Sequence, residues 1–273
     1  MTEARTDPTV LLVDQDMESA AAYDFAAGRV LLRTNRMPGK ETANEDAVAL
    51  IPFAPGRGVI AVADGVGGRP SGDLASALAL QALRASITEA ALAGDFLRES
   101  ILNGIERANR VVLERGGGGA TTLSIAEVRE DAVRSYHVGD SLILITGQRG
   151  RVRMQTVAHS PIGYAVESGL LGEREAMVHE DRHLISNMIG ASDMRIEIGP
   201  VLRMARRDTL LIASDGLSDN LTSDELVDSV RKGALDDVAA RLHATASRRM
   251  AGAPDGHPSK PDDLSFVLFR RRL

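Results

Sequence analysis

The sequence predicts an α+β fold in which helices pack on paired antiparallel sheets. Four strand-like runs between residues 121 and 157 carry turn signals about ten residues apart, a spacing typical of antiparallel meanders. Along the chain the order is strands, two helices, many strands, two helices and a last strand, which favours sheets covered by helices. No shift of composition marks a boundary and no repeat suggests a solenoid, so we expect a single domain over residues 1–273.

The composition is that of an acidic globular protein. Hydrophobic residues make up 44% of the 273 positions and charged residues 26%, which is ordinary for a folded domain. The net charge of -6 argues against a nucleic-acid binder, which would carry a basic face. The absence of cysteine excludes disulfides, thiolate catalysis and cysteine-ligated zinc. The acidic N-terminus does not resemble a signal peptide and no apolar run is long enough for a membrane span, so we expect a cytoplasmic protein without a membrane partner.

The first half of the chain predicts strands followed by two helices. Residues 1–27, with "TVLLVDQDME", indicate an N-terminal arm or an edge strand. "DAVALI" (46–51) and "GVIAVAD" (58–64) are short apolar runs rich in β-branched residues and predict strands. An Ala/Leu-rich helix is expected over 71–92 with Ser71 as its N-cap, and a second helix over 95–114 that stops at "GGGG".

The second half predicts mostly strands. The expected strands are "TTLSIAEV" (121–128), "AVRSYHV" (132–138), "SLILIT" (141–146), "VRMQTV" (152–157), "TLLIAS" (209–214) and "LSFVLFR" (264–270). Helices are expected at about 223–232 and 234–250. Residues 159–195 are mixed and polar, and predict a flap with short helices at best.

Acidic residues gather at the predicted strand ends. Buried runs end in Asp64-Gly65 and Asp215-Gly216, and a third strand ends at Asp140. Two further pairs stand just before strands: Glu45 with Asp46, and Asp262 with Asp263. In antiparallel sheets the C-terminal ends of some strands lie beside the N-terminal ends of others, so we expect these clusters to meet at one edge.

Carboxylates gathered without basic partners repel and desolvate one another, and hard divalent cations remove that cost. Ligand sets made only of oxygen suit Mg²⁺ or Mn²⁺. Glycine after aspartate lets the backbone approach closely, which makes the Gly65 carbonyl a candidate ligand. A single Asp-Gly pair is more often an ordinary turn; the prediction depends on five clusters.

The motifs "NED", "ADGVGG", "GATT", "HVGDS", "ASDGLSD" and "PDDLS", in this order, resemble the PPM family of metal-dependent Ser/Thr protein phosphatases (type 2C). The resemblance covers about residues 28–273, and Val66 in "DGVGG" is similar to the bacterial branch. It implies a four-layer αββα sandwich with two central antiparallel sheets flanked by helices.

By this resemblance, Asp64 bridges two Mg²⁺ or Mn²⁺ ions and Gly65 contributes its carbonyl oxygen to one of them. Asp215 and Asp262 match the acids that hold the second ion. Glu45 is expected to reach the ions through water, with Asp46 as a supporting acid. Asp140 and Asp219 are expected to hold a third ion together with Asp215. Asp263 is expected to be a neighbour of the site rather than a ligand.

The implied activity is hydrolysis of phosphoserine and phosphothreonine in proteins, with substrates supplied by a Ser/Thr kinase in signalling. A water bridging two ions is acidified to hydroxide and attacks phosphorus in line, while the ions stabilise the phosphoryl oxygens. No covalent enzyme intermediate is needed, in agreement with the absence of cysteine.

The chain departs from the family pattern at the phosphate-gripping position. The family commonly has an arginine four residues before the first-motif glutamate, and this chain has Glu41 there. Lys40, Arg33 and Arg36 lie nearby, and one of them is expected to bind phosphate instead, although lysine is a poorer bidentate partner. Val66 also removes a possible proton donor.

Three alternatives have sequence support. "GDSL" would make Ser141 a hydrolase nucleophile, but no histidine after it has an aspartate three residues earlier. "HEDRH" matches the HExxH zinc-protease motif, with His179 and His183 as ligands and Glu180 as base. Glu41 favours a third alternative, a catalytically weak or inactive phosphatase fold that only binds a partner.

Overall fold

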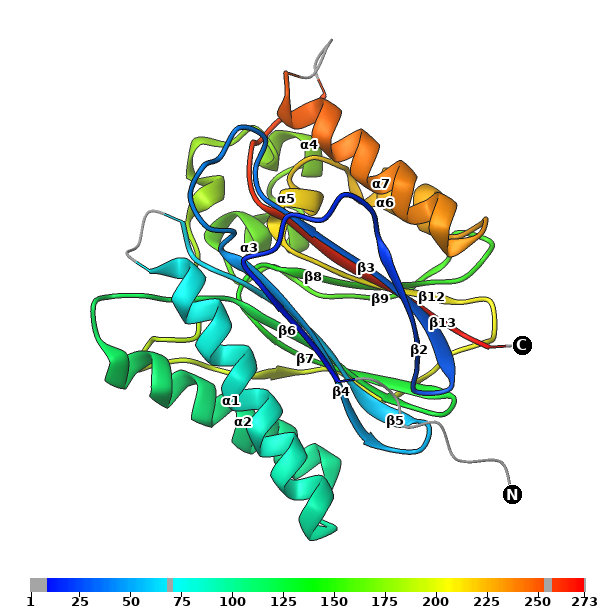
Figure 1. Ribbon diagram of the computed structural model, residues 1–273. Helices are drawn as coiled ribbons and strands as arrows, with labels where there is room; N and C mark the ends of the chain where they lie inside the picture. The colour runs from blue at the N-terminus through cyan, green and yellow to red at the C-terminus, as the bar shows by residue number, and fades with distance from the viewer. Residues whose placement is uncertain (1–8, 68–70, 253–256, 273) are drawn as a thin grey trace.

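The computed structural model describes residues 9–67, 71–252 and 257–272, and they form four layers (Figure 1). Two antiparallel sheets pack face to face in the middle, and a pair of helices covers the outer face of each sheet. The predicted α+β sandwich is therefore confirmed. Among the described residues, no helix is both long and apolar enough to cross a bilayer.

The first sheet has the strand order β1-β4-β5-β6-β7-β10, and β11 also pairs with β7. Its strands are β1 (Val10–Val13), β4 (Asp46–Ala54), β5 (Arg57–Asp64), β6 (Leu123–Arg129), β7 (Ala132–Val138), β10 (Glu197–Ile198) and β11 (Leu202–Arg203). The second sheet has the order β2-β3-β13-β12-β8-β9. Its strands are β2 (Ala21–Phe25), β3 (Gly28–Asn35), β8 (Leu142–Thr146), β9 (Val152–Gln155), β12 (Thr209–Ala213) and β13 (Leu264–Arg271).

The helices lie on the two outer faces and in the flap. The long helices α1 (Gly72–Ala93) and α2 (Leu97–Arg115) cover the first sheet, while α6 (Ser223–Val230) and α7 (Leu235–Met250) cover the second. Short elements are α3 (Pro161–Glu167), α4 (Glu173–Ala176), the 3₁₀ turn η1 (Glu180–His183) and α5 (Asp215–Ser218). The expected flap thus has three short helical turns.

The central strands β4 and β12 are mostly apolar because both of their faces are buried. In β4, Ala47, Ala49 and Ile51 pack against α1 and α2, whereas Val48 and Leu50 pack between the two sheets. A third core joins the second sheet to α6 and α7. Small and branched aliphatic side chains make up most of all three cores, and the 3% of aromatic residues contribute only a few buried rings, such as Tyr136, Phe25, Phe266 and Phe269.

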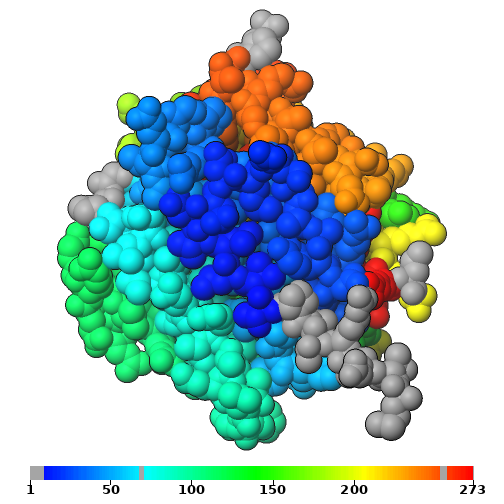
Figure 2. Space-filling model, in the orientation of Figure 1, coloured from blue at the N-terminus to red at the C-terminus, as the bar shows by residue number. Residues whose placement is uncertain are grey.

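The N-terminal segment and the start of α1 differ from simple expectations. β1 is the edge strand of the first sheet, but residues 21–35 form β2 and β3 of the second sheet, which the sequence pattern did not reveal. Figure 2 shows this N-terminal segment (blue) lying on the surface between α1 and α7. Residues 1–8 lie outside the described residues. Ser71 precedes α1, but it has a left-handed backbone (φ 61°) and its side chain makes no capping hydrogen bond.

Candidate metal centre

Acidic residues of the first sheet come together where β4 begins and β5 ends. Asp46 and Asp64 are directly opposite each other in the β4–β5 ladder, so their backbones are cross-strand neighbours. Glu45 immediately precedes this pair, and its main-chain oxygen accepts a hydrogen bond of 3.0 Å from the Gly65 N–H. Antiparallel pairing therefore joins the "NED" and "ADG" motifs, as the sequence predicted.

Acidic residues of the second sheet lie at three neighbouring strand ends. Ala213, the last residue of β12, pairs with Leu142 of β8 on one side and with Phe266 of β13 on the other. Asp215 follows β12 and is the first residue of α5, while Asp140 precedes β8 and Asp262 precedes β13. One edge of the sheet thus collects acids from three motifs.

Hydroxyl and amide hydrogen bonds join the two sheets at this edge. Ser214 Oγ donates to Asp46 Oδ2 at 2.8 Å, and the Asp215 N–H donates to Asp64 Oδ2 at 3.3 Å. Thr122 Oγ1 accepts from the Asp64 N–H at 3.1 Å and lies 2.7 Å from Ser141 Oγ. These contacts fix the acids of one sheet relative to those of the other. Sequence reasoning missed Thr122 and Ser214, although both lie inside the quoted motifs.

The glycines after Asp64 and Asp215 permit close backbone approach. A Cβ on Gly65 would lie 2.5 Å from the Gly72 carbonyl at the start of α1. A Cβ on Gly216 would lie only 1.9 Å from the Asp263 carbonyl oxygen. Glycine is therefore required sterically at both positions, because backbone atoms cannot move aside as a flexible side chain can.

Burial and mutual repulsion disfavour ionisation of these acids. Burial, and then the charges of Asp215 and Asp219, raise the pKa of Asp140 to about 8. Burial and Asp215 raise the pKa of Asp219 to about 6 and that of Asp262 to about 7. Burial and neighbouring acids likewise raise the pKa of Asp64.

Two carboxylate oxygens at this edge lack protein partners. Among the described residues, Asp46 Oδ1 and Asp140 Oδ1 are buried with no hydrogen-bond partner. A buried polar atom without a partner is costly, and a cation supplies the missing partner. All the converging donors are oxygens, which suits a hard divalent ion such as Mg²⁺ or Mn²⁺. The residues present therefore fit a metal centre.

A lysine that the sequence analysis did not single out lies within the acidic cluster. Lys260 Nζ is 2.5 Å from Asp215 Oδ2, 2.9 Å from Asp219 Oδ2 and 3.3 Å from Asp262 Oδ2. It stands two residues before Asp262, in "SKPDD", so its proximity to that one acid was readable from the sequence. Its contacts with Asp215 and Asp219 could not be predicted from the sequence.

The three basic residues expected to bind phosphate have different surroundings. Lys40 Nζ contacts Glu45 Oε2 at 2.8 Å and Asp263 Oδ2 at 2.7 Å, so it touches the acidic site. The Arg33 guanidinium donates to Asn35 and to two main-chain oxygens. Arg36 pairs with Asp14 at 2.9 Å. Of the three, Lys40 is the one that contacts a predicted site residue.

Asp263 organises the loop before β4. Its carboxylate accepts hydrogen bonds from the Met37 N–H at 2.8 Å and the Glu45 N–H at 2.7 Å, besides its ion pair with Lys40. This role agrees with the expectation that Asp263 is a neighbour of the site rather than a ligand. It also joins the backbone of Glu45 to the segment just before β13.

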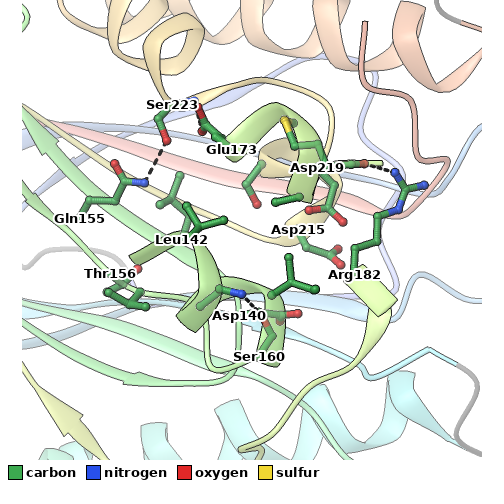
Figure 3. Close-up of a pocket in the computed structure, with 18 of the residues that line it drawn as sticks. Asp140, Leu142, Gln155, Thr156, Ser160, Glu173, Arg182, Asp215, Asp219 and Ser223 are labelled. Carbon is green, nitrogen blue, oxygen red and sulfur yellow. Dashed lines mark hydrogen bonds between the residues drawn. The ribbon is translucent and has the colours of Figure 1, made fainter. Parts of the chain in front are cut away.

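A pocket of about 470 Å³ opens beside the acids, between the flap and α5–α6. Figure 3 shows Asp140, Asp215 and Asp219 on one side of it, with Arg182 of the flap nearby, whose guanidinium donates to the main-chain oxygens of Met177 and Ser259. The positive charge of Arg182 contributes to lowering the pKa of Asp219 against the larger effect of burial. Apolar side chains such as Leu142, together with flap residues, line much of the rest.

The "GDSL" and "HEDRH" motifs do not form the sites of their namesake enzymes. Ser141 is fully buried and hydrogen-bonded to Thr122, so it is not available as a nucleophile. His179 and His183 flank and end a single 3₁₀ turn. Their Nδ1 atoms bond to nearby backbone groups instead of converging on one point. The α-helical spacing that HExxH requires is absent.

A separate triplet of His137, His159 and Glu197 brings its ligand atoms within 4.8 Å of one another. The Nδ1 atom of His159 accepts hydrogen bonds from the Gly139 N–H at 3.1 Å and from Asn187 Nδ2 at 2.9 Å. The neutral ring therefore carries its proton on Nε2, which donates to Glu197 Oε2 at 3.1 Å. This nitrogen has no lone pair for a metal, so His159 and Glu197 form a hydrogen-bonded support for Gly139, and the His137 ring packs against that of His159 with centroids 4.2 Å apart.

The fold and the acidic edge define a class of protein. Residues 39–251 match the protein phosphatase 2C family, and this match covers more than half of the 273 residues. The chain therefore belongs to this family of metal-dependent phosphatases, as the resemblance predicted.

Individual relatives agree with this assignment. The chain is 30% identical over 199 residues to protein phosphatase PhpP of Streptococcus pneumoniae, covering 70% of this chain and 80% of the relative. It superposes on the S. agalactiae serine/threonine phosphatase with a TM-score of 0.75, 27% identity and coverage of 89% and 99%. A PPM Ser-Thr phosphatase of Mycobacterium smegmatis in complex with cacodylate gives a TM-score of 0.72 at 27% identity, with 94% and 100% covered.

Proposed function

We propose that this protein hydrolyses phosphoserine and phosphothreonine in other proteins with two Mg²⁺ or Mn²⁺ ions, and a third ion at an outer position. The observation that carries the proposal is the convergence of Asp64, Asp215 and Asp262 from two sheets, beside buried carboxylate oxygens of Asp46 and Asp140 that have no protein partner. The named relatives, a protein phosphatase and a serine/threonine phosphatase, support the reaction class. We further expect that a Ser/Thr kinase supplies the phosphoprotein substrates.

The ligand set follows from the strand ends. Asp64 and the Gly65 carbonyl would hold the ions from the first sheet, with Glu45 acting through water. Asp215 and Asp262 would hold them from the second sheet, and Asp140 and Asp219 would complete the outer position with Asp215. Bound divalent ions supply Lewis acidity, which lowers the pKa of coordinated water and neutralises charge on the phosphoryl oxygens.

The protein's own groups position this set. The Thr122 hydroxyl holds the Asp64 backbone, and Ser214 fixes the Asp46 carboxylate on the side away from its unpartnered oxygen. Fixing a ligand through such outer contacts is worth about 10–100-fold in metal affinity or activity. Asp46 is buried and unexposed to substrate, so we assign it a supporting role.

Phosphate recognition remains a prediction for Lys40, Arg33 and Arg36. The contact between Lys40 and Glu45 places its ammonium group nearest to the predicted ligands. Lys40→Ala should raise KM for a phosphopeptide, while Arg33→Ala and Arg36→Ala should act less because their side chains bind the N-terminal segment. An unchanged KM in all three would leave phosphate binding to other residues.

The test is metal-dependent turnover of p-nitrophenyl phosphate and of a phosphothreonine peptide. We expect activity with Mn²⁺, none with EDTA, and a loss of more than ~100-fold in Asp64→Asn and Asp215→Asn, since even outer partners of metal ligands contribute 10–100-fold. Asp236→Asn is the matched control, because Asp236 is an exposed acid paired with Arg29 on the surface. Full activity in both site variants would refute the catalytic assignment.

The same variants address the alternative of an inactive binding protein. Glu41, at the position where the family commonly has arginine, is the observation that favours this alternative. Binding of a phosphopeptide without any turnover, in every divalent metal tried, would support it.

A further inference from the structure

The ammonium group of Lys260 lies among acids predicted to hold the second and third metal ions. It contacts Asp215, Asp219 and Asp262 at 2.5, 2.9 and 3.3 Å. Only 18% of its side chain is exposed. Burial lowers the pKa of Lys260 and its carboxylate neighbours raise it, with a net upward shift, so the side chain is a cation at neutral pH.

The backbone of Lys260 is held in place by a fully buried side chain. Asn220 Oδ1 accepts from the Lys260 N–H at 3.0 Å, and Asn220 Nδ2 donates to the Lys260 carbonyl at 2.8 Å. Arg249 in turn donates to the Asn220 main-chain oxygen. Pro261 follows and restricts the next φ angle. The lysine is thus anchored beside Asp219, and the ammonium group reaches the acids from a fixed base.

The charges around Lys260 do not balance. Its single positive charge faces three carboxylates in direct contact, and Asp140 is a further acid affected by its field. Lys260 lowers the pKa of Asp140, Asp219 and Asp262, yet each of these stays above its usual value. A divalent ion brings twice the charge and can bind several carboxylates at once.

A lysine ammonium and a metal ion cannot both contact the same carboxylate oxygens. Asp215 Oδ2 is the oxygen at 2.5 Å from Lys260 Nζ, and Asp215 is also a predicted ligand of both the inner and the outer ions. A divalent ion bound to the same oxygen would lie within a few ångströms of the ammonium group, and like charges that close repel strongly in a partly buried site. Metal binding therefore requires Lys260 to withdraw from at least one of its partners.

We propose that Lys260 is a built-in counter-cation that competes with divalent metal for Asp215, Asp219 and Asp262. In the metal-free protein its ammonium group stabilises the acidic cluster, and metal binding displaces it. This inference rests on the proposed metal-dependent function and adds to it a residue that sets how readily the site fills. Without metal, the Lys260 charge reduces the repulsion among the carboxylates. With metal, the affinity is lowered because the contacts of Lys260 with these carboxylates must be broken first.

The competition links two measurable quantities in opposite directions. Removing the charge of Lys260 should tighten metal binding, because no contact with the lysine has to be broken first. The same change should destabilise the metal-free protein, because the carboxylates lose their counter-cation. A purely structural lysine would lower stability with and without metal and would not tighten metal binding.

The experiment compares Mn²⁺ binding by calorimetry and thermal unfolding in EDTA and in Mn²⁺, for the wild type and Lys260→Met. We expect Lys260→Met to bind Mn²⁺ about 5–100-fold more tightly, the usual range of a coupling between two sites. Its unfolding temperature in EDTA should fall, and the increase produced by Mn²⁺ should exceed that of the wild type. Lys260→Arg, which keeps the charge, should bind Mn²⁺ about as weakly as the wild type.

Lys232→Met is the matched control, since Lys232 is exposed and its substitution changes the net charge equally. It should leave both quantities unchanged. If Lys260→Met does not fold, Lys260→Gln carries the same test, because the amide can still donate to a carboxylate without a charge. Unchanged or weaker Mn²⁺ binding in the neutral variants would overturn the proposal. Failure of the wild type to bind Mn²⁺ at all would instead refute the proposed function.

Discussion

Substitution of Gly216 by alanine tests the close approach between α5 and β13. Gly216 follows Asp215 in the first turn of α5, and a Cβ there would lie 1.9 Å from the Asp263 carbonyl oxygen and 3.0 Å from its carbon. Asp215 and Asp262 flank this contact, so any movement that relieves it changes the spacing of two predicted metal ligands.

Two opposing effects determine the sign of the stability change. Alanine is favoured over glycine in a helix by about 1 kcal/mol, so an unobstructed site would be stabilised. Overpacking typically costs about 1–3 kcal/mol, and a contact of 1.9 Å with backbone belongs at the upper end of that range. The net expectation is destabilisation by about 1–2 kcal/mol, which corresponds to a fall of about 2–8 °C in Tm for a domain of this size.

The assay is thermal and urea unfolding of Gly216→Ala, together with Mn²⁺ calorimetry. Gly172→Ala is the control, because Gly172 has an ordinary φ of -74° and a Cβ added there would meet no other atom within 4 Å. We expect the control to change stability by less than about 0.5 kcal/mol and Gly216→Ala to weaken Mn²⁺ binding as well. An increase of stability in Gly216→Ala with unchanged Mn²⁺ binding would refute the close approach.

Three further predictions concern the acids and the ion pair between Arg249 and Glu225, of which Arg249 is the buried partner. The folded pKa values of Asp140 (about 8) and Asp262 (about 7) exceed the unfolded value of 3.8. The free energy of unfolding in EDTA, measured by urea titration, should therefore fall as the pH rises from about 4 to 8. Asp140→Asn should make that fall less steep. Asp140→Ala should weaken Mn²⁺-dependent turnover, whereas Ser141→Ala should retain most of it. Ser141→Ala should lose about 1 kcal/mol of stability, because it removes a buried hydrogen bond. Equal losses of turnover in the two variants would contradict the assignment of Asp140, and not Ser141, to the metal site. Arg249→Met should lower the free energy of unfolding in urea by about 2 kcal/mol, because it removes the donors to Glu225 and to the buried Asn220 carbonyl. A change below about 0.5 kcal/mol would show that the ion pair contributes little.

The acidic motifs could be predicted from the sequence because each is a local pattern. A buried apolar run followed by Asp-Gly, as at Asp64 and Asp215, indicates a strand that ends in a carboxylate whatever the rest of the fold. The two-faced burial of β4 is also visible locally, since its run from Ala47 to Ile51 has no polar residue. The helices α1 and α2 were placed within a few residues for the same reason.

Other elements could not be placed from local patterns. β2 and β3 carry polar residues such as Asp24, Arg29 and Arg33 among their apolar ones, and neither contains a long apolar run that marks it as a strand. The short strands β10 and β11 have two residues each and depend on pairing with β7. Such elements are defined by their partners rather than by their own sequence.

The sequence by itself determined which residues are acidic, that they end or precede apolar strands, and which family these motifs match. Only the tertiary structure decided that Lys260 stands among Asp215 and Asp219, more than forty positions away in the chain, and that Thr122 holds the backbone of Asp64. The physical reason is that each contact joins the ends of strands brought together only by sheet pairing, β12 with β13 and β5 with β6, so it depends on which strands become neighbours. A local pattern specifies what each strand carries to the shared edge, and packing specifies what it meets there.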